Sequence, residues 1–349
     1  MKRIAVLCMT MITAVALTGC SLSPASQPKR YQAEFLTLFD TATKIIGYAD
    51  SEEIFKEQVQ IVYDELEKYH QLYDIYNDYD GINNIKTIND KAGMEPVVVD
   101  EKIIDLLLLG KEMYQKTDGK LNIAFGSVLS IWHDYRTDGL DDPENAKLPP
   151  MEKLLEANKH VDIDKVIINE ENSTVYLEDA GLSLDVGSIG KGYAVEQAAK
   201  AAKEAGITSM LMSVGGNIRA IGVKGDGERW KVGIQNPFDD ETEEYLKKVY
   251  VEDISLVTSG DYQRYYEVEG KPYHHIINTD TLMPAENFRA VSILCSDSGV
   301  ADALSTSVYN MTYEEGLSFV EGLEGVEAMW IFDDKTIEYS SGFEKSLAD

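Results

Sequence analysis

Apolar and polar residues alternate over residues 35–49, and this period predicts a strand or a hairpin near the start of the folded chain. Residues 52–73 and 100–116 instead carry apolar side chains at intervals of three and four, which predicts two amphipathic helices. Two short apolar runs, at 166–168 and 174–177, flank a polar turn and predict a hairpin. Predicted strands and predicted helices therefore alternate through the first half of the chain.

The alternation continues in the second half. The Ala-rich residues 194–205 have a helical composition, and residues 210–221 form an apolar strand that Gly215-Gly216 interrupts. Adjacent glycines there indicate a bulge or a close approach of the backbone to a ligand. Residues 290–295 have the composition of a buried strand, and Asp297 is a candidate N-cap for the helix that follows. The pattern predicts a mixed α/β or α+β fold.

Two segments between these elements are predicted as loops. Residues 73–89 are rich in Asn, Asp, Gly and Tyr, which is typical of an ordered surface loop. Tyrosines in such a loop can bind an aromatic ligand, although a packed loop is the simpler interpretation. Residues 138–150 are acidic and contain prolines, so we expect an exposed insertion there.

The N-terminus has the pattern of an export signal. Lys2 and Arg3 precede an apolar run over residues 4–17 that is too short to cross roughly 30 Å of hydrocarbon comfortably. The sequence Leu17-Thr18-Gly19-Cys20 then resembles a bacterial lipobox, in which cleavage leaves the cysteine as the first residue, carrying lipid. The alternative is an ordinary signal peptide with a chance cysteine.

These observations predict three parts of the chain: a lipoprotein signal peptide at 1–19, a lipidated Cys20 with a flexible tether to residue 30, and one two-lobed domain over 31–349. The expected location is the extracytoplasmic face of the cell membrane, held by the lipid. After processing, Cys295 is the remaining thiol, so no internal disulfide forms and the core must supply the stability. We expect Cys295 to be buried.

The chain is strongly acidic, with 61 Asp and Glu against 32 Lys and Arg and a formal net charge of −29. Such a surface repels phosphate backbones and anionic lipid headgroups, which argues against nucleic acid as a partner. A phosphate-bearing ligand would need a local cation, either a metal ion or a sheltered lysine.

Residues 183–195, SLDVGSIGKGYAV, are a candidate phosphate site. An apolar run that we interpret as a strand ends at Asp185, and three glycines and Lys191 then lead into a helical segment. A glycine turn at the start of a helix gathers backbone N–H groups and the positive end of the helix dipole. The spacing matches neither the Walker loop nor the dinucleotide fingerprint, so a tight turn without a ligand explains this stretch as well.

A second candidate site lies in Ala301-Asp302-Ala303-Leu304-Ser305-Thr306. In a helix, Asp302 and Thr306 share one face, with Ser305 beside them. A carboxylate with hydroxyls is a set of hard oxygen ligands suited to Mg²⁺. The alternative is that Asp302 complements the helix dipole and Thr306 bonds back to its own helix.

The histidines offer one candidate base. His274 and His275 precede the apolar pair Ile276-Ile277, and on a strand one of the two faces inward while the other faces outward. One of them is therefore a candidate general base. The remaining three are scattered and are interpreted as structural or exposed: His70, His133 and His160.

Taken together, five motifs in this order behind a lipobox resemble the ApbE family of FAD:protein FMN transferases: DVGSIGKGYAVE, SVGGN, TSGDYQRYY, YHHIIN and ADALST. The resemblance extends over the mature chain from Phe39-Asp40-Thr41 onward. It implies an ApbE-like domain with a cleft for FAD between two lobes. It also implies transfer of FMN from FAD to a Thr or Ser hydroxyl of an acceptor flavoprotein, with Mg²⁺ as cofactor and AMP as the other product.

The resemblance also implies roles for individual residues. His275 would be the catalytic base. Four residues would hold the metal: Ser188 through its carbonyl, Asp302, Ser305 and Thr306. Seven would contact FAD: Phe39, Tyr76, Leu121, Asn122, Asp185, Lys191 and Ile276.

The chain departs from the family pattern at two places. The family commonly has Asp-Pro after the two isoleucines, where this chain has Asn278-Thr279, and Ser188 stands where glycine or alanine is common. A backbone carbonyl ligand tolerates the second change. Two other functions use the same residues: a Mg²⁺-dependent FAD pyrophosphatase that gives FMN and AMP, or a lipoprotein that binds flavin without catalysis.

Overall fold

The computed structural model describes residues 27–238 and 243–348. At its centre is an eight-stranded sheet whose neighbouring strands are all antiparallel. The strands follow the order β1 (Lys29–Leu38), β2 (Thr41–Ala49), β6 (Met210–Val214), β7 (Asn217–Ile221), β10 (Ser255–Gly260), β13 (Ala290–Cys295), β14 (Glu327–Ile331) and β15 (Ile337–Tyr339). Antiparallel strands combined with helices make the fold α+β, which confirms the predicted mixed class.

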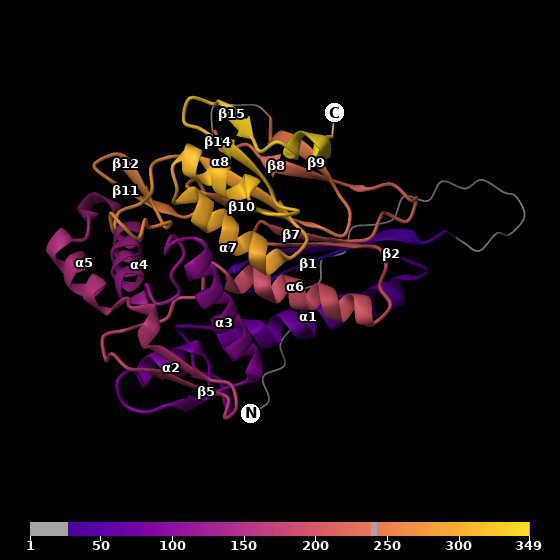
Figure 1. The fold of residues 1–349 in the computed structure, drawn as a ribbon. Helices are drawn as coiled ribbons and strands as arrows, with labels where there is room; N and C mark the ends of the chain where they lie inside the picture. Colours follow the sequence, from indigo (N-terminus) through magenta and orange to yellow (C-terminus); the bar gives the residue numbers. More distant parts are fainter. Residues whose placement is uncertain (1–26, 239–242, 349) are drawn as a thin grey trace, which may run out of the picture.

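Four helices lie along one face of this sheet (Figure 1): α1 (Glu52–Tyr73), α6 (Gly190–Glu204), α7 (Ser298–Tyr309) and α8 (Tyr313–Glu321). The first of them has the predicted bounds. Its buried side chains recur every three or four residues, at Phe55, Val59, Val62, Leu66 and Tyr69. This single apolar stripe is what holds the helix against the sheet.

The other face of the sheet is covered by a hairpin of β8 (Trp230–Gln235) and β9 (Tyr245–Val251). Trp230, Val232 and Ile234 alternate with more exposed residues, so one side of β8 is buried against the sheet. The sheet is therefore buried on both faces, which makes it a rigid support for the loops at its ends.

A smaller layer lies on the far side of α1 (Figure 1). It consists of α2 (Ile85–Asp90), α3 (Glu101–Lys116) and a sheet in the order β3 (Val97–Val98), β5 (Thr174–Leu177), β4 (Val166–Asn169). The predicted second helix and the predicted β4–β5 hairpin are confirmed. Buried side chains of this layer belong to the same core cluster as α1, so the two layers form one continuous interior.

The third part lies at one end of the sheet, on the left of Figure 1. It packs α4 (Gly126–Asp141) and α5 (Met151–Ala157) against the hairpin of β11 (Tyr265–Val268) and β12 (Lys271–His274). The indole N–H of Trp132 donates to the carbonyl of Leu282 at 3.0 Å, which ties α4 to the loop after β12. This packing places α4 beside the histidine pair.

The structure corrects the predicted boundary of the tether. Strand β1 begins at Lys29 and pairs with β2, so the last two residues of the predicted tether belong to the sheet. Signal peptide 1–19 and Cys20 lie outside the described residues. The predicted strand or hairpin at 35–49 is a hairpin, and Phe39 and Asp40 form its two-residue turn with φ of 55° and 48°. Positive φ at both positions is the geometry of a type I′ turn.

Four other predictions need correction. Gly215 and Gly216, with φ of 52° and 91°, form the turn of the β6–β7 hairpin rather than a bulge within one strand. The apolar run before Asp185 is not a regular strand and makes only one isolated bridge, between Phe125 and Ser183. Helix α4 continues to Asp141, so the predicted insertion begins inside a helix, and the predicted loop at 73–89 contains most of α2.

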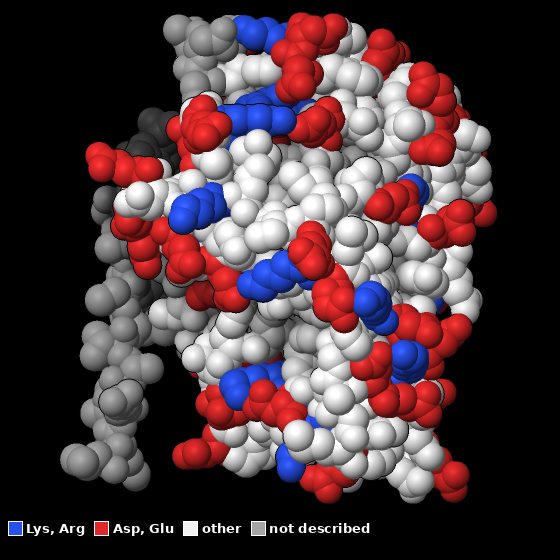
Figure 2. Space-filling view, turned by 90° about the vertical axis from the view of Figure 1, so that its left-hand side faces the viewer, with Lys and Arg blue, Asp and Glu red and all other residues white. Residues whose placement is uncertain are grey.

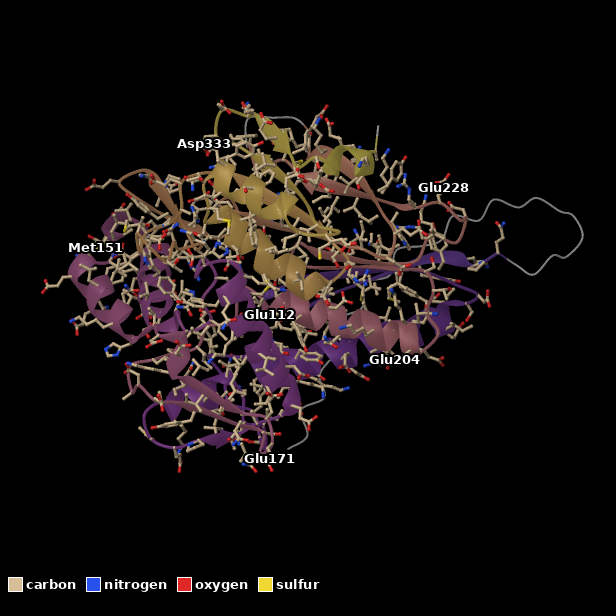
Figure 3. All side chains as sticks on the ribbon, in the orientation of Figure 1. Glu112, Met151, Glu171, Glu204, Glu228 and Asp333 are labelled. Atoms are coloured by element: carbon tan, nitrogen blue, oxygen red, sulfur yellow. The ribbon has the colours of Figure 1, made fainter. Side chains whose placement is uncertain are left out.

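The acidic side chains point outward from many elements. Figure 3 labels five exposed acidic residues, Glu112 near the middle of the view and the other four toward its edge: Glu171, Glu204, Glu228 and Asp333. On the face in Figure 2, acidic side chains lie around the edge with basic ones between them, while uncharged side chains fill much of the upper middle. Cys295 is buried, as predicted. Over 27–238 and 243–348, we find no helix long and apolar enough to cross a membrane.

Candidate active site

The glycine turn before α6 is organised by Asp185. Its backbone N–H donates to the carbonyl of Ile123 at 2.9 Å, and its Oδ1 accepts from the N–H of Gly187 at 2.8 Å. These two bonds fix the turn, and α6 then begins at Gly190. The N–H groups of Gly190 and Gly192 already have acceptors, the carbonyl of Val186 at 2.7 Å and Oδ2 of Asp302 at 2.8 Å. The predicted positive end therefore consists of the helix dipole of α6 and Lys191.

Helices α6 and α7 touch at Gly192. Its N–H donates to Oδ2 of Asp302 at 2.8 Å. A Cβ atom at this position would lie 2.2 Å from the carbonyl oxygen of Ser298 and 2.4 Å from the Cβ of Asp302, so only glycine fits. Glu196 strengthens the contact, because its carboxylate accepts from the N–H of Ser298 at 3.0 Å and pairs with Arg219 at 2.9 Å.

This close packing brings Lys191 and Asp302 together in buried surroundings. Burial raises the pKa of the Asp302 carboxyl, and the charge of Lys191 opposes that rise. Burial likewise lowers the pKa of the Lys191 ammonium, against the effect of Asp302. Lys191 is therefore the sheltered basic side chain near Asp302 that a phosphate ligand of this acidic protein requires.

Three hydroxyl groups form a cluster beside Asp302 on α7 and β10. Ser259, at the end of β10, lies 2.8 Å from the hydroxyl of Ser305 and 3.4 Å from that of Thr306. The hydroxyl of Ser305 also donates to the carbonyl of Asp302 at 2.9 Å, so part of its capacity is already used. The structure thus brings three of the four predicted metal ligands together. Ser188 lies in the glycine turn, half-buried, two residues before α6.

This donor set fits a hard cation that is held jointly with a substrate. Among residues 27–238 and 243–348, no group of three or more His, Cys, Asp and Glu side chains is placed to hold a metal. Asp302 is therefore the one carboxylate among the predicted ligands, with hydroxyls beside it. Mg²⁺ is typically bound by one or two carboxylates together with substrate phosphates, which is the arrangement that this set allows.

The two adjacent histidines have different environments. The Nε2 of His274 lies 2.7 Å from the carbonyl of Ala285, and its Nδ1 accepts from the N–H of Ile276 at 3.2 Å. Both ring nitrogens of His274 are thus occupied by the backbone, which gives it a structural role. The Nδ1 of His275 is buried and has no hydrogen-bond partner among the described residues, so it is free to accept a proton.

His275 is kept neutral by its surroundings. Burial lowers the pKa of its imidazole well below the usual 6.5, and the positive charges of Arg264, Arg136 and Lys191 lower the pKa further. Its backbone N–H donates to the carbonyl of Arg264 at 3.1 Å. A neutral imidazole with one unpartnered nitrogen is the form required of a general base.

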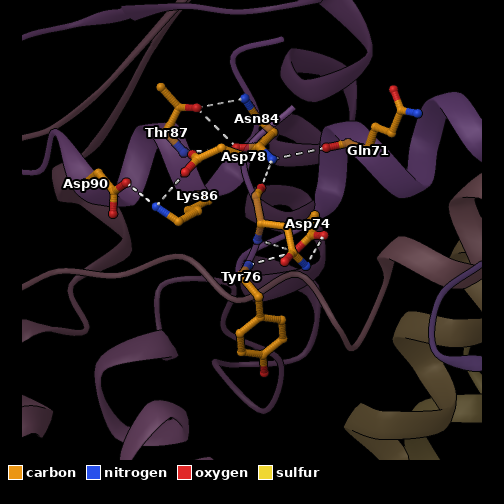
Figure 4. Close-up of polar contacts among 9 residues, drawn as sticks. Gln71, Asp74, Tyr76, Asp78, Asn84, Lys86, Thr87 and Asp90 are labelled. Atoms are coloured by element: carbon orange, nitrogen blue, oxygen red, sulfur yellow. Dashed lines mark hydrogen bonds and ion pairs between the residues drawn. The ribbon is translucent and has the colours of Figure 1, made fainter. Parts of the chain in front are cut away.

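Tyr76 projects from a loop whose backbone is held by polar contacts (Figure 4). The Oδ1 of Asp74 accepts from the N–H groups of Tyr76 at 2.6 Å and Asn77 at 3.0 Å. The amide of Asn84 donates to the carbonyls of Asn77 at 2.9 Å and Gln71 at 3.2 Å. The Tyr76 ring itself extends away from this network and is 58% exposed.

The other predicted FAD contacts lie around the same region with less free surface. Phe39 is in the β1–β2 turn rather than in a strand, and its N–H donates to Nδ1 of His70 at 3.2 Å. Leu121 and Ile276 are buried in the core. The Asn122 side chain accepts from the N–H of Ala124 and donates to the carbonyl of Val161, which leaves one N–H and one lone pair for a ligand.

Sequence reasoning missed four side chains near the site: His133, Arg136, Ser259 and Arg264. His133 was interpreted as scattered, yet it lies between Tyr76 and Asp185. Ser259 and Arg264 lie in the TSGDYQRYY motif, whose residue pattern alone assigns neither of them a role. His133 and Arg136 are three residues apart on α4 and therefore share a face, which was the available signal.

Comparison with known proteins supports the resemblance. A protein of Treponema pallidum named FAD:protein FMN transferase is 34% identical over 272 residues, which cover 74% of this chain and 73% of the relative. An Escherichia coli K12 protein of the same name is 27% identical over 327 residues, 90% of this chain and 89% of the relative.

The fold agrees as well. The crystal structure of the ApbE protein from Thermotoga maritima matches 92% of this chain and all of its own chain, with a TM-score of 0.79 and 27% sequence identity. The sequence model of the ApbE family matches residues 39–330, which include every motif and every predicted site residue apart from Cys20. The chain therefore belongs to the ApbE family, as its ordered motifs predict.

Proposed function

We propose that this protein is an enzyme that transfers FMN from FAD to a Thr or Ser hydroxyl of an acceptor flavoprotein and releases AMP. Family membership and relatives named FAD:protein FMN transferase support the reaction class. The observation that carries the proposal is the contrast between His274 and His275: only the second has a free, buried ring nitrogen. A protein that merely binds flavin needs no such base.

The proposed reaction is a phosphoryl transfer. The acceptor oxygen attacks the phosphorus on the FMN side of the diphosphate, and the bond from that phosphorus to the bridging oxygen breaks. The Nδ1 of His275 takes the proton of the attacking hydroxyl, and AMP leaves with the bridging oxygen. Because little covalent chemistry falls to the protein, most of the catalysis is positioning and charge neutralisation.

The glycine turn and Lys191 are the chain's own contribution to charge neutralisation. The N–H groups at the start of α6 and the Lys191 ammonium face the same buried region as Asp302. Asp302, Ser305 and Thr306, with the carbonyl of Ser188, would hold Mg²⁺. When bound, Mg²⁺ supplies positive charge to the diphosphate oxygens. Asp302 and the hydroxyls orient that charge, and Lys191 adds a second cation.

Intact-mass analysis tests this proposal. The protein is co-expressed with a candidate acceptor flavoprotein, and the acceptor's mass is compared with that of a Thr/Ser→Ala acceptor variant. We expect a gain of one FMN that the acceptor variant lacks. Incubation with FAD and Mg²⁺ without acceptor is the second arm. If AMP is released rapidly without acceptor and the acceptor gains no mass in the first arm, the protein is a pyrophosphatase and not a transferase.

We also propose that the protein is anchored to the membrane by lipid on Cys20. The support is the four-residue lipobox at the end of a basic and apolar leader. Cys20→Ser should move the protein out of the membrane fraction or leave the leader uncleaved. Membrane fractionation and the N-terminal mass measure this directly, and unchanged results for the variant would refute the anchor.

A further inference from the structure

His133 joins two predicted FAD contacts that come from opposite sides of the site. The hydroxyl of Tyr76 lies 2.9 Å from its Nδ1, and Oδ2 of Asp185 lies 4.0 Å from its Nε2. The Tyr76 and His133 rings are 6.3 Å apart between centroids. Tyr76 belongs to the loop after α1, His133 to α4 and Asp185 to the glycine turn. Three segments that are distant in the sequence thus meet at one imidazole.

One tautomer of His133 serves both neighbours. With its proton on Nε2, the ring directs an N–H toward the Asp185 carboxylate and accepts from the Tyr76 hydroxyl with Nδ1. The Asp185 carboxylate is already oriented, because its other oxygen accepts from the N–H of Gly187 at 2.8 Å. At 4.0 Å the Nε2–Oδ2 separation is an electrostatic contact rather than a hydrogen bond.

The Tyr76 side chain depends on His133 for its position. Asp74 and Asn84 fix the backbone of the loop but leave the tyrosine ring free to rotate (Figure 4). The ring is 58% exposed, and the one hydrogen bond that its hydroxyl makes among the described residues goes to His133. Without that bond, ligand binding would have to order the ring, which lowers the affinity.

We propose that His133 is a positioning residue that holds Tyr76 and the glycine turn in the geometry that binds FAD. This inference rests on the proposed function and deepens it: His133 acts on affinity for FAD and leaves the chemical step to His275. Since it acts through the Tyr76 hydroxyl, removing either partner should remove the same contribution.

A double-mutant cycle tests this inference. The variants are His133→Phe, which keeps a ring without polar atoms, Tyr76→Phe, which removes only the hydroxyl, and the two combined. FAD affinity is measured by titration calorimetry, and transfer kinetics give KM for FAD and kcat. We expect each single variant to weaken FAD binding and raise KM roughly three- to tenfold, with kcat within about twofold. The combined variant should lose no more than His133→Phe alone, which already lacks the contacts to both Tyr76 and Asp185.

The control is His160→Phe. His160 also pairs with an aspartate, with 2.9 Å between its Nδ1 and Oδ1 of Asp179, but none of its hydrogen bonds or ion pairs within the described ranges reaches Tyr76 or residues 185–192. Its FAD affinity should stay at the wild-type value. Thermal unfolding without FAD checks that each variant is folded, and if His133→Phe does not fold, Tyr76→Phe with His133→Asn completes the cycle.

The outcomes separate this inference from the proposed function. Wild-type protein that binds no FAD would overturn the proposed function. Wild-type protein that binds FAD and transfers FMN, together with additive losses in the cycle or with unchanged affinity in His133→Phe, would overturn the role of His133 alone. A fall in kcat without a change in KM would also contradict it.

Discussion

The candidate site has two walls that are built in different ways. The glycine wall consists of residues 185–192 with α7, and backbone contacts hold it: the Gly192 N–H bonds to Asp302 and leaves no room for a side chain. The histidine wall consists of Tyr76, His133 and His275, and side-chain tips from three distant segments form it. Substitutions that add side-chain volume should therefore damage the glycine wall most. Substitutions that remove a single polar atom should damage the histidine wall most.

The largest effect is expected from adding one carbon to the glycine wall. Gly192→Ala places a Cβ against the Ser298 carbonyl at 2.2 Å, and backbone atoms yield less easily than side-chain tips. We expect α6 and α7 to separate, with a loss of about 1–3 kcal/mol or more in the free energy of unfolding and no measurable transfer. Urea unfolding and FMN transfer are the measurements.

Gly190→Ala is the matched control within the same helix. A Cβ there would lie 3.4 Å from Cδ2 of Tyr73 and 3.6 Å from a methyl of Val186, which are ordinary packing distances. Its stability should stay within about 1 kcal/mol of wild type. If Gly190→Ala and Gly192→Ala behave alike, the close contact of α6 with α7 does not define this wall.

On the histidine wall, a single polar atom should decide activity. His275→Asn removes the free Nδ1, and we expect transfer to fall by about 10²–10⁴-fold while FAD affinity stays within a small factor. His274→Asn breaks two backbone contacts instead, so it should mainly lower the unfolding temperature. Single-turnover transfer, FAD titration and thermal unfolding are measured for both. If His275→Asn transfers FMN normally while His274→Asn is stable but inactive, His274 and not His275 is the base.

The two walls also differ in how far the sequence predicts them. The residues of the glycine wall are close together in the sequence. Asp185, Lys191 and the glycines lie within one short segment, and Asp302 lies in one helix with Ser305 and Thr306. Their spacing therefore predicts which side chains lie together. The fold follows from apolar periods in the same way, as in α1, where the predicted and observed bounds agree. The apolar run before Asp185 misled, because that segment is extended but pairs at only one position.

The histidine wall depends on tertiary contacts that no local period records. His133 looks like any half-exposed helical histidine until α4 is packed against the Tyr76 loop. Arg136 and Arg264 lie far apart in sequence, yet both lower the pKa of His275 through their charges. The sequence also does not distinguish the hairpin turn at Gly215-Gly216 from a bulge. An apolar run interrupted by two glycines is compatible with one broken strand and with two strands joined by a tight turn.

A smaller effect should appear in the metal dependence of the glycine wall. Asp302→Asn keeps an oxygen for the Gly192 N–H but removes the one carboxylate among the predicted ligands. We expect the Mg²⁺ concentration for half-maximal transfer to rise at least about tenfold. Asp297→Asn is the control, because this N-cap residue bonds to the N–H groups of Gly299 and Val300, and asparagine caps equally well. An equal shift in both variants would mean that only the net charge of α7 matters.

The smallest expected effect concerns the pH dependence of stability, and it sharpens the contrast within the histidine wall. Burial lowers the pKa of His133, His274 and His275 below the usual value of 6.5. In this window the unfolded chain binds more protons than the folded one, so stability is full above about pH 6.5 and falls as the pH drops toward the lowered values. Each histidine contributes a slope of up to about 1.4 kcal/mol per pH unit.

His275→Asn isolates one of these contributions. Its free energy of unfolding should fall less steeply than that of wild type between about pH 6.5 and 5, because one fewer buried imidazole takes up a proton on unfolding. Asp261 acts in the opposite sense, since burial raises its pKa to about 6, but it is present in both proteins and cancels in the comparison. Urea unfolding at several pH values measures the difference. Parallel curves would mean that His275 is already accessible to protons in the folded protein, and the buried neutral base would then lose its physical foundation.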